Sequence, residues 1–255
     1  MKRGSRANEP AVERRSGAAR GAAEPVTRRV FHELKSAIVT MVLPPGRALS
    51  EAEIAAQMGV SRQPVREAFI KLSEAGLVRI RPQRGTFVVK ISTKQVTDAR
   101  FVREAVEVAV ACKACEVMTA ETIAALRENL VQQQAVVADG SPANFLALDE
   151  AFHRDLAFGV DCDYAWRVVE EVKAQMDRVR YLSMPQTTPL SRLVEQHVAI
   201  LDAVESRDAA RAEAAMRAHL AEILTSLPRL AEVYPHLFDS GENTEQTPSL
   251  ESTGT

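Results

Sequence analysis

Four side chains in the second half of the sequence could together bind a divalent metal ion. Asp149 and His153 are four residues apart, so on a helix their carboxylate and imidazole project from the same face. His197 and His219 are 22 residues apart, about the length of a helix, a turn and most of a second helix. Facing helices of a bundle can bring both imidazoles inward.

Three imidazoles and one carboxylate suit a borderline divalent ion. Zinc is the first choice, nickel and manganese are alternatives, and open coordination positions could take water or the carboxylate of a small molecule. On spacing alone, histidines that are merely hydrogen-bonded in the core or on the surface remain an alternative.

A second group of side chains, earlier in the sequence, could read DNA. Arg62 and Arg66 lie four residues apart, on one face of a predicted helix and near its N-terminus. Arginine is the side chain best matched to the two major-groove acceptors of guanine, while serine and glutamine can bond phosphates or base edges. The residues predicted to make these contacts are Ser61, Arg62, Gln63 and Arg66.

A basic hairpin follows this helix. Arg81 and Arg84 are placed for phosphate or minor-groove contact, and Gly85 allows a tight turn and close backbone approach. Any one arginine could belong to an ordinary solvated face, but a helix, a turn, a basic helix and a basic hairpin in succession favour nucleic-acid binding. We expect Glu67 to orient Arg66 or another basic side chain.

The elements that would present these side chains begin with a helix-turn-helix. Apolar residues recur at helical spacing over 30–38, and a Pro-Pro-Gly sequence then ends the helix. Ser50 starts a capping box for a short second helix, which Gly59 closes with a turn. Ser61 can cap a third helix over 62–75.

A wing and a helical bundle are predicted next. Alternating apolar and basic residues over 77–81, a turn, and a strand over 86–89 predict a two-stranded hairpin. The periodicity from residue 96 to 235 is entirely helical, with breaks near 139–142, 160–163, 184–189 and 206–208. The predicted fold is mainly α: an N-terminal winged helix-turn-helix and a C-terminal all-helical antiparallel bundle.

Composition divides the chain into four regions. Residues 1–24 carry almost no large apolar side chains and are predicted to be a disordered arm. Residues 239–255 are Gly, Ser, Thr, Glu and Pro-rich and are predicted to be a disordered tail. Between them we expect a DNA-binding domain over 25–91 and a helical domain over 92–238.

Charge separates the two central regions. Residues 26–90 contain 11 Lys+Arg and 5 Asp+Glu, a net charge of +6, whereas residues 91–238 contain 15 and 22, a net charge of −7. The first region therefore has the electrostatic character of a phosphate-binding module.

Hydropathy and cysteine content indicate the compartment. No run approaches the ~18 apolar residues of a membrane span, and the start lacks the apolar segment of a secretory signal, so we expect a cytoplasmic protein without a membrane partner. The three cysteines, Cys112, Cys115 and Cys162, are expected to stay reduced. Cys112 and Cys115 form a C-x-x-C inside a predicted helix, and without a second pair we assign them to packing.

The motifs of the first domain resemble those of the GntR superfamily of bacterial regulators. The matching segments are 43–46, 49–53, 59–68, 76–78 and 81–86. The helical part resembles the FadR-type ligand-binding domain, called FCD, so the resemblance covers roughly residues 26–238.

The resemblance implies a homodimer on a palindromic double-stranded DNA operator, usually repressing and released by a metabolite. The helical domain would then bind the effector and dimerise. Arg62 and Arg66 match base or phosphate readers of the family, and Arg84 with Gly85 matches its minor-groove contact. Ala52 stands where some FadR relatives have a DNA-contacting arginine, which puts that contact in doubt.

The resemblance also strengthens the metal prediction. Segments 148–153, 195–197 and 216–219 resemble the FCD motifs whose aspartate and three histidines hold a divalent metal. Arg103 and Glu107 match an arginine and a glutamate of the domain's first helix, which implies that Arg103 faces the cavity and could clamp a carboxylate. A surface ion pair is the alternative.

Other residues of the helical domain are weaker candidates. Arg180 and Tyr181 could contact an effector hydroxyl or carboxylate, whereas Arg178 is expected to face outward or pair with Asp177. The segment 161–162 reads Asp-Cys where many FCD sequences read Gly-Asn, so that corner is uncertain. Relatives that share these motifs point to control of sugar-acid catabolism.

We therefore expect a repressor, not an enzyme, that senses a small carboxylate such as a sugar acid through a metal site. One alternative is a DNA-binding protein whose helical domain only dimerises, against which Arg103 and the four-ligand set argue. A metal-dependent enzyme is the other alternative, but the sequence places no additional acid or base beside the site.

Overall fold

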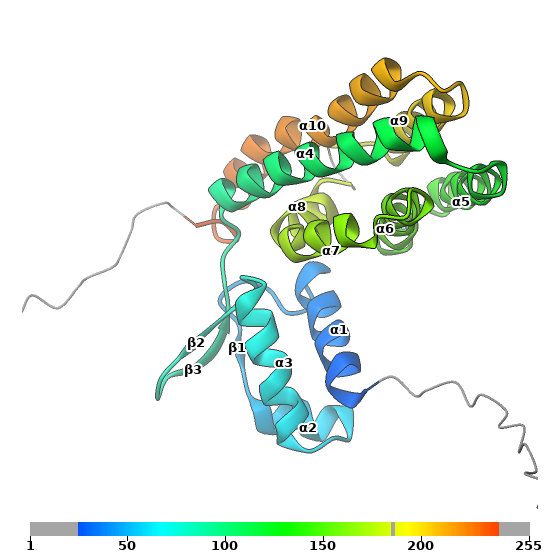
Figure 1. Cartoon of the computed structure of the whole chain (residues 1–255). Helices are drawn as coiled ribbons and strands as arrows, with labels where there is room; N and C mark the ends of the chain where they lie inside the picture. The colour runs from blue at the N-terminus through cyan, green and yellow to red at the C-terminus, as the bar shows by residue number, and fades with distance from the viewer. Residues whose placement is uncertain (1–24, 185–186, 240–255) are drawn as a thin grey trace, which may run out of the picture.

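The computed structural model describes residues 25–184 and 187–239 (Figure 1). Figure 1 shows a small domain with a projecting hairpin below a larger group of helices. The arm predicted over 1–24 and, apart from Asp239, the tail predicted over 239–255 lie outside the described residues.

The first domain is built on the predicted helix-turn-helix. Its helices are α1 (Val26–Val39), α2 (Glu51–Met58) and α3 (Arg62–Glu74). Val30, Leu34 and Ile38 recur along one face of α1 and are buried against α3, which explains why this stretch is helical.

A side-chain cap explains where α2 begins but not where α3 begins. The Ser50 hydroxyl accepts a hydrogen bond from Glu53 N, and Gly59 ends α2 with a φ of 64°, both as predicted. Ser61 occupies the N-cap of α3, but its side chain makes no capping hydrogen bond. The hydroxyl of Ser61 therefore lies at the end of α3 without stabilising it in the predicted way.

The wing is the predicted hairpin with one additional strand. β2 (Val78–Arg81) and β3 (Gly85–Val88) pair antiparallel, with Arg81 opposite Gly85. β1 (Ala48–Leu49) pairs with the other edge of β3, giving the order β1-β3-β2. The sequence did not predict β1, because two residues are too few to show an alternating pattern.

The second domain consists of helices, so the predicted fold class is confirmed. All the predicted breaks occur. The helices are α4 (Thr93–Val117), α5 (Ala120–Asp139), α6 (Pro142–Gly159), α7 (Asp163–Val172), α8 (Ala174–Ser183), α9 (Leu190–Glu205) and α10 (Ala209–Val233).

Figure 1 shows α4 and α10 running along each other on the side away from the first domain, and α7 and α8 on the side facing it. The main core lies between these layers and includes Phe152 of α6, Leu201 of α9 and Met216 of α10. Residues next to these three on the same helices are thereby held at fixed positions inside the bundle.

At the corner between α6 and α7, Asp161 has a φ of 56°. This is the left-handed conformation that glycine adopts freely and that aspartate tolerates better than most residues. Aspartate thus makes the same turn here that a glycine would make.

Helix α8 joins the two domains. Ala174 belongs to the same buried cluster as the core of the first domain, and Gln175 Nε2 donates a hydrogen bond to Gly76 O (2.7 Å). Arg178 is fully buried and its Nη2 donates to Val89 O (3.0 Å). The prediction that Arg178 faces outward or pairs with Asp177 was therefore wrong, because the first domain covers this side of α8.

The segment that connects the two domains is hydrogen-bonded to residues 237–239. Ile91 N donates to Leu237 O (2.9 Å) and Asp239 N donates to Ile91 O (2.9 Å). Ile91 and Phe238 thereby form a parallel bridge, and both side chains are buried.

Candidate metal centre and nucleic-acid interface

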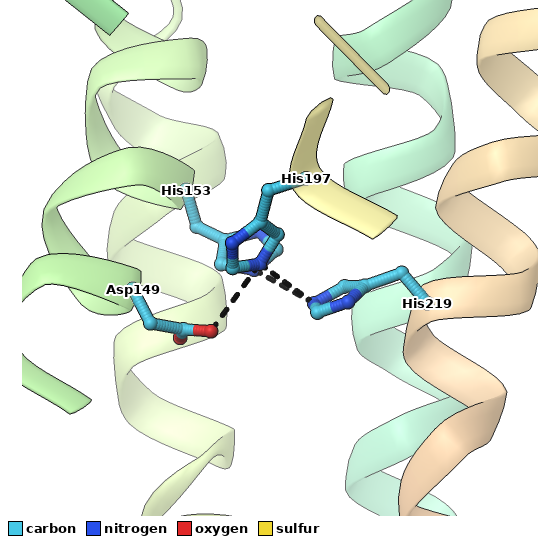
Figure 2. Close-up of side chains that lie close together, drawn as sticks. All are labelled: Asp149, His153, His197 and His219. Atoms are coloured by element: carbon cyan, nitrogen blue, oxygen red, sulfur yellow. Dashed lines mark hydrogen bonds and ion pairs between the residues drawn. The ribbon is translucent and has the colours of Figure 1, made fainter. Parts of the chain in front are cut away.

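The four predicted metal ligands meet inside the bundle. Asp149 and His153 come from successive turns of α6, His197 from α9 and His219 from α10, and Figure 2 shows all four side chains pointing toward one another. One ligand atom from each lies within 4.8 Å of the others, and all four residues are buried. The sequence prediction that these side chains come together is confirmed.

The imidazoles approach one another through the same atom. His219 Nε2 lies 3.1 Å from His153 Nε2 and 3.3 Å from His197 Nε2, while His197 Nε2 lies 3.3 Å from Asp149 Oδ1. Each histidine therefore directs Nε2 to a common centre.

The opposite ring nitrogens face acceptors outside the cluster. His197 Nδ1 lies 2.8 Å from Gln133 Oε1, His219 Nδ1 lies 3.1 Å from Gln196 Oε1, and His153 Nδ1 lies 2.5 Å from Glu107 Oε2. A neutral imidazole whose Nδ1–H faces an acceptor has its lone pair on Nε2. Three such lone pairs and a carboxylate directed at one buried point repel one another unless a cation lies between them, so the residues fit a metal ion.

Burial and charge set the protonation states that metal ligands need. Burial lowers the pKa of His197 and, more strongly, that of His219. Burial would raise the pKa of Asp149, but the charge of Arg180 foremost holds it well below its usual value. The two imidazoles are thus neutral and the carboxylate is ionised near neutral pH.

A buried ion pair supports the third histidine. Arg103 Nε donates to Glu107 Oε1 at 2.5 Å, and the second Glu107 oxygen faces His153. Burial would raise the pKa of Glu107, but the charge of Arg103 foremost, together with the hydrogen bonds from His153 and Arg103, lowers it to about 2. Arg103 lines the cavity as predicted, and its partner Glu107 is buried rather than on the surface.

A cavity of about 240 Å³ lies beside the cluster. The predicted effector contacts Arg103 and Arg180 line it, together with Asp149 and His153. Arg180 is also ion-paired with Asp149. Tyr181 is half-buried but is not among the residues that line this cavity.

Sequence reasoning missed the amides around the cluster. Gln133 Nε2 donates to Asn129 Oδ1, and Asn129 Nδ2 donates to Leu148 O, so the Gln133 oxygen is fixed toward His197. Gln196 directly precedes His197 but contacts His219 instead. The motif spacing does not indicate either glutamine, because their roles depend on which helices face each other.

The C-x-x-C cysteines lie in α4. Cys115 is buried in the main core, Cys112 is half-buried and packs against it, and burial raises the pKa of both thiols. Both are therefore poor nucleophiles and pack as small apolar side chains.

The predicted major-groove readers are exposed at the start of α3. Ser61, Arg62 and Gln63 are exposed, and Arg62 makes no hydrogen bond or ion pair with any described residue. Arg66 is exposed too, but its Nε and Nη2 donate to Glu51 at 3.1 and 3.0 Å.

The prediction for Glu67 was wrong. Glu67 accepts hydrogen bonds from Gln63 Nε2 and Thr27 Oγ1, both at 2.9 Å, and orients no arginine. The sequence could not show that Glu51, at the start of α2, lies closer to Arg66 than Glu67 does.

The wing presents its predicted residues to solvent. Arg81, Arg84 and Gly85 are all exposed, and Gly85 has a φ of 98°, which favours glycine. The guanidinium of Arg81 lies over the Phe87 ring, 5.8 Å from its centre. Recognition helix and wing thus form two basic surfaces on one small domain.

Within the described residues, no helix is both long and apolar enough to cross a membrane.

Two family models match the chain. Residues 26–88 match bacterial regulatory proteins of the gntR family, and residues 98–222 match the FCD domain. The chain is 42% identical over 209 residues to the HTH-type transcriptional repressor RspR of Escherichia coli (strain K12). The aligned region covers 82% of this chain and 92% of that protein.

A more distant relative and a solved structure agree with these matches. The gluconate operon transcriptional repressor of Bacillus subtilis (strain 168) is 26% identical over 187 residues, covering 71% of this chain and 76% of that protein. Escherichia coli McbR/YncC has a TM-score of 0.71 at 20% identity, covering 83% of this chain and 100% of that one, and shows the shared fold.

Proposed function

Because this chain belongs to the GntR family of transcriptional regulators and carries an FCD domain, we propose that it is a metal-containing repressor released from DNA by a small carboxylate. Regulators of this family and the relatives named above are not enzymes. The proposal concerns the metal, the effector, the homodimer and the operator.

The convergence of three Nε2 atoms and one carboxylate carries this proposal. Asp149, His153, His197 and His219 would hold the ion, zinc first and nickel or manganese as alternatives. The bound ion would supply a Lewis-acidic centre with positions left for an oxygen ligand. Glu107, Gln133 and Gln196 hold the imidazoles in the tautomer that such an ion needs.

The cavity beside this cluster supports an acidic effector. Arg180 lines the cavity next to Asp149, so its guanidinium can attract a carboxylate that approaches the ion. Arg103 is engaged by Glu107 and contributes mainly by fixing the Glu107 carboxylate that faces His153. A sugar acid is the favoured class, and the name of the Bacillus subtilis relative connects that protein with gluconate.

DNA binding would use the two basic surfaces of the first domain. The start of α3 would enter the major groove, with Ser61, Arg62, Gln63 and Arg66 at the bases and phosphates. Arg81, Arg84 and Gly85 of the wing would contact phosphates or the minor groove. Two copies related by a twofold axis would read the halves of a palindrome.

Release follows if the effector changes the spacing of the two recognition helices. A coupling free energy of ~1 to 3 kcal/mol between effector and DNA is enough for a regulatory response. The alternative that the helical domain only dimerises predicts no effect of any acid on DNA affinity.

Metal analysis of the purified protein tests the proposal. Wild-type protein should hold roughly one ion per chain, and His197→Ala should lose it while staying folded, because one of the converging ligands is gone. The exposed His236 provides a matched control, so His236→Ala should keep the metal. The same samples are titrated with D-gluconate and, separately, with the diacid D-glucarate in the presence of a duplex selected from a random library.

The metal site and the effector class are tested separately. Intact metal content in His197→Ala contradicts the ligand assignment. Metal in the wild type without any effect of either acid on DNA binding contradicts the effector class and leaves the metal site standing.

A further inference from the structure

The cavity beside the metal cluster has a wall made by the DNA-binding domain. Besides residues of α4, α6, α7 and α8, it is lined by His32, Lys35, Ser36, Val39 and Thr40, which all belong to α1 or its C-cap. Figure 1 shows the C-terminal end of α1 directly below α7 and α8, and α1 contacts α8. A ligand in this cavity would therefore touch both domains.

Most cations of the cavity already have a partner. Arg103 pairs with Glu107, Arg180 pairs with Asp149, and Lys173 Nζ pairs with Asp177 (2.5 Å) and Glu150 (3.0 Å). These pairs neutralise three of the positive charges that face the cavity.

Lys35 is different. It is half-buried, and among the described residues no hydrogen bond or ion pair engages its ammonium group. The charge of Lys35 acts on Asp177, which lines the helical-domain side of the cavity. Burial raises the pKa of Asp177, whereas Lys173, Arg180 and, after them, Lys35 lower it. A partly desolvated cation facing a cavity favours an anionic ligand.

We propose that Lys35 binds a second anionic group of the effector, whose first carboxylate lies at Arg180 and the metal centre. The effector is then a diacid that bridges the sensor domain and α1 of the DNA-binding domain. This inference rests on the proposed function and adds a residue outside the helical domain to the effector site.

A ligand that bridges the two domains explains how effector binding in the cavity can change the affinity for DNA. α1 packs along the recognition helix α3 in the core of the first domain. A ligand that shifts α1 therefore shifts α3 as well. A monoacid could occupy the metal end of the cavity without engaging α1.

The single tryptophan provides the readout. Trp166 is the only tryptophan in the sequence and lines the cavity, so its fluorescence reports occupancy directly. D-glucarate, a diacid, and D-gluconate, the matching monoacid, are titrated against zinc-loaded wild type, Lys35→Met and Arg29→Met. Arg29 is the control because it is an exposed cation on the same helix, pairs with Glu33, and does not line the cavity.

We expect wild type and Arg29→Met to bind D-glucarate about tenfold or more tightly than D-gluconate, the scale of one charge-assisted hydrogen bond. Lys35→Met should lose that preference, keep its affinity for D-gluconate and keep its metal. Hydrogen exchange of the α1 amides should slow on adding D-glucarate to wild type and Arg29→Met, and stay unchanged in Lys35→Met.

Two other results overturn the proposal. If Lys35→Met keeps the preference for D-glucarate, or wild type shows none, the second anionic contact is wrong while a carboxylate effector still stands. If neither acid changes Trp166 fluorescence in metal-loaded wild type, the acidic effector of the proposed function fails and the bridging ligand fails with it.

Discussion

Arg62 and Arg66 lie on one face of α3 but are held differently. Arg66 is tied through Nε and Nη2 to Glu51, whereas Arg62 makes no hydrogen bond or ion pair with the described residues. A guanidinium must present two free N–H groups to read guanine bidentately. Arg62 can do so without breaking an existing pair, so it is the stronger candidate for base recognition.

Replacing Arg62 with alanine should weaken binding to a selected operator by about tenfold or more, and binding to unrelated DNA much less. Fluorescence anisotropy on both duplexes at one salt concentration measures this, because phosphate contacts depend strongly on salt. Arg229→Ala, on the exposed side of α10, is the control. Equal losses on the two duplexes would show that Arg62 contacts only phosphate.

The metal ligands could be predicted residue by residue, but their supporting side chains could not. Asp149 and His153 share a helix face by spacing alone, and the motif around His197 and His219 indicated the other two. Gln133 and Gln196 carry no such signal, because a glutamine acquires its role only when the facing helix brings an imidazole within hydrogen-bond distance. Spacing along the chain contains no information on that distance.

Helix α8 serves both domains at once. Ala174, Gln175 and Arg178 contact the DNA-binding domain, while Arg180 on the same helix is ion-paired with Asp149 in the metal cluster. Burial lowers the pKa of Arg178 to about 10, and its guanidinium is nevertheless hydrogen-bonded to Val89 O. Through α8, buried residues of the helical domain pack directly against the DNA-binding domain.

We therefore expect the molecule to unfold in one cooperative transition. Gly59→Ala should lower the stability of the whole chain by about 1 kcal/mol, because the left-handed φ of 64° disfavours alanine although the space around it is open. Gly140→Ala, with a φ of 63° in the helical domain, is the matched variant. Calorimetry should show the same single transition shifted in both.

Independent domains would give a different calorimetric result. Two transitions, of which Gly59→Ala moves one and Gly140→Ala moves the other, would show that α8 does not couple the domains.

Most elements were predictable, and two of the exceptions are informative. The break between α7 and α8 falls at Lys173, which has ordinary helical backbone angles and no glycine or proline beside it. β1 exists only because Ala48 and Leu49 meet β3 across the sheet. In both places tertiary contacts, rather than local residue preferences, determine the structure.

The metal cluster connects helices that are distant in sequence. Asp149 and His153 on α6, His197 on α9 and His219 on α10 converge at one buried point, so an ion there would fasten three helices. An ion binds only the folded arrangement, and at a free concentration 100 times its Kd it stabilises the fold by about 2.7 kcal/mol.

Adding a chelator should accordingly lower the thermal midpoint of the wild type by several degrees, and zinc should restore it. His197→Ala should show a low midpoint that neither addition changes, whereas His236→Ala should follow the wild type. Equal responses of His197→Ala and wild type to the chelator would mean that the stabilising ion binds elsewhere.

How the two domains meet was beyond the reach of the sequence. The fold class followed from periodicity, but the burial of Arg178 and the position of Lys35 in the cavity wall depend on the docking of α1 against α8. The docking surface carries polar as well as apolar residues, so no hydrophobic period marks it.

The bridge between Ile91 and Phe238 has a further consequence for this architecture. The chain enters the helical domain at Ile91 and leaves it at Phe238, and these two residues lie side by side. Units whose two ends meet are readily transplanted, although here the contacts of α8 with Gly76 and Val89 would have to be rebuilt as well as the junction. This geometry would therefore allow one helical sensor domain to be replaced by another during evolution while the DNA-binding domain is kept.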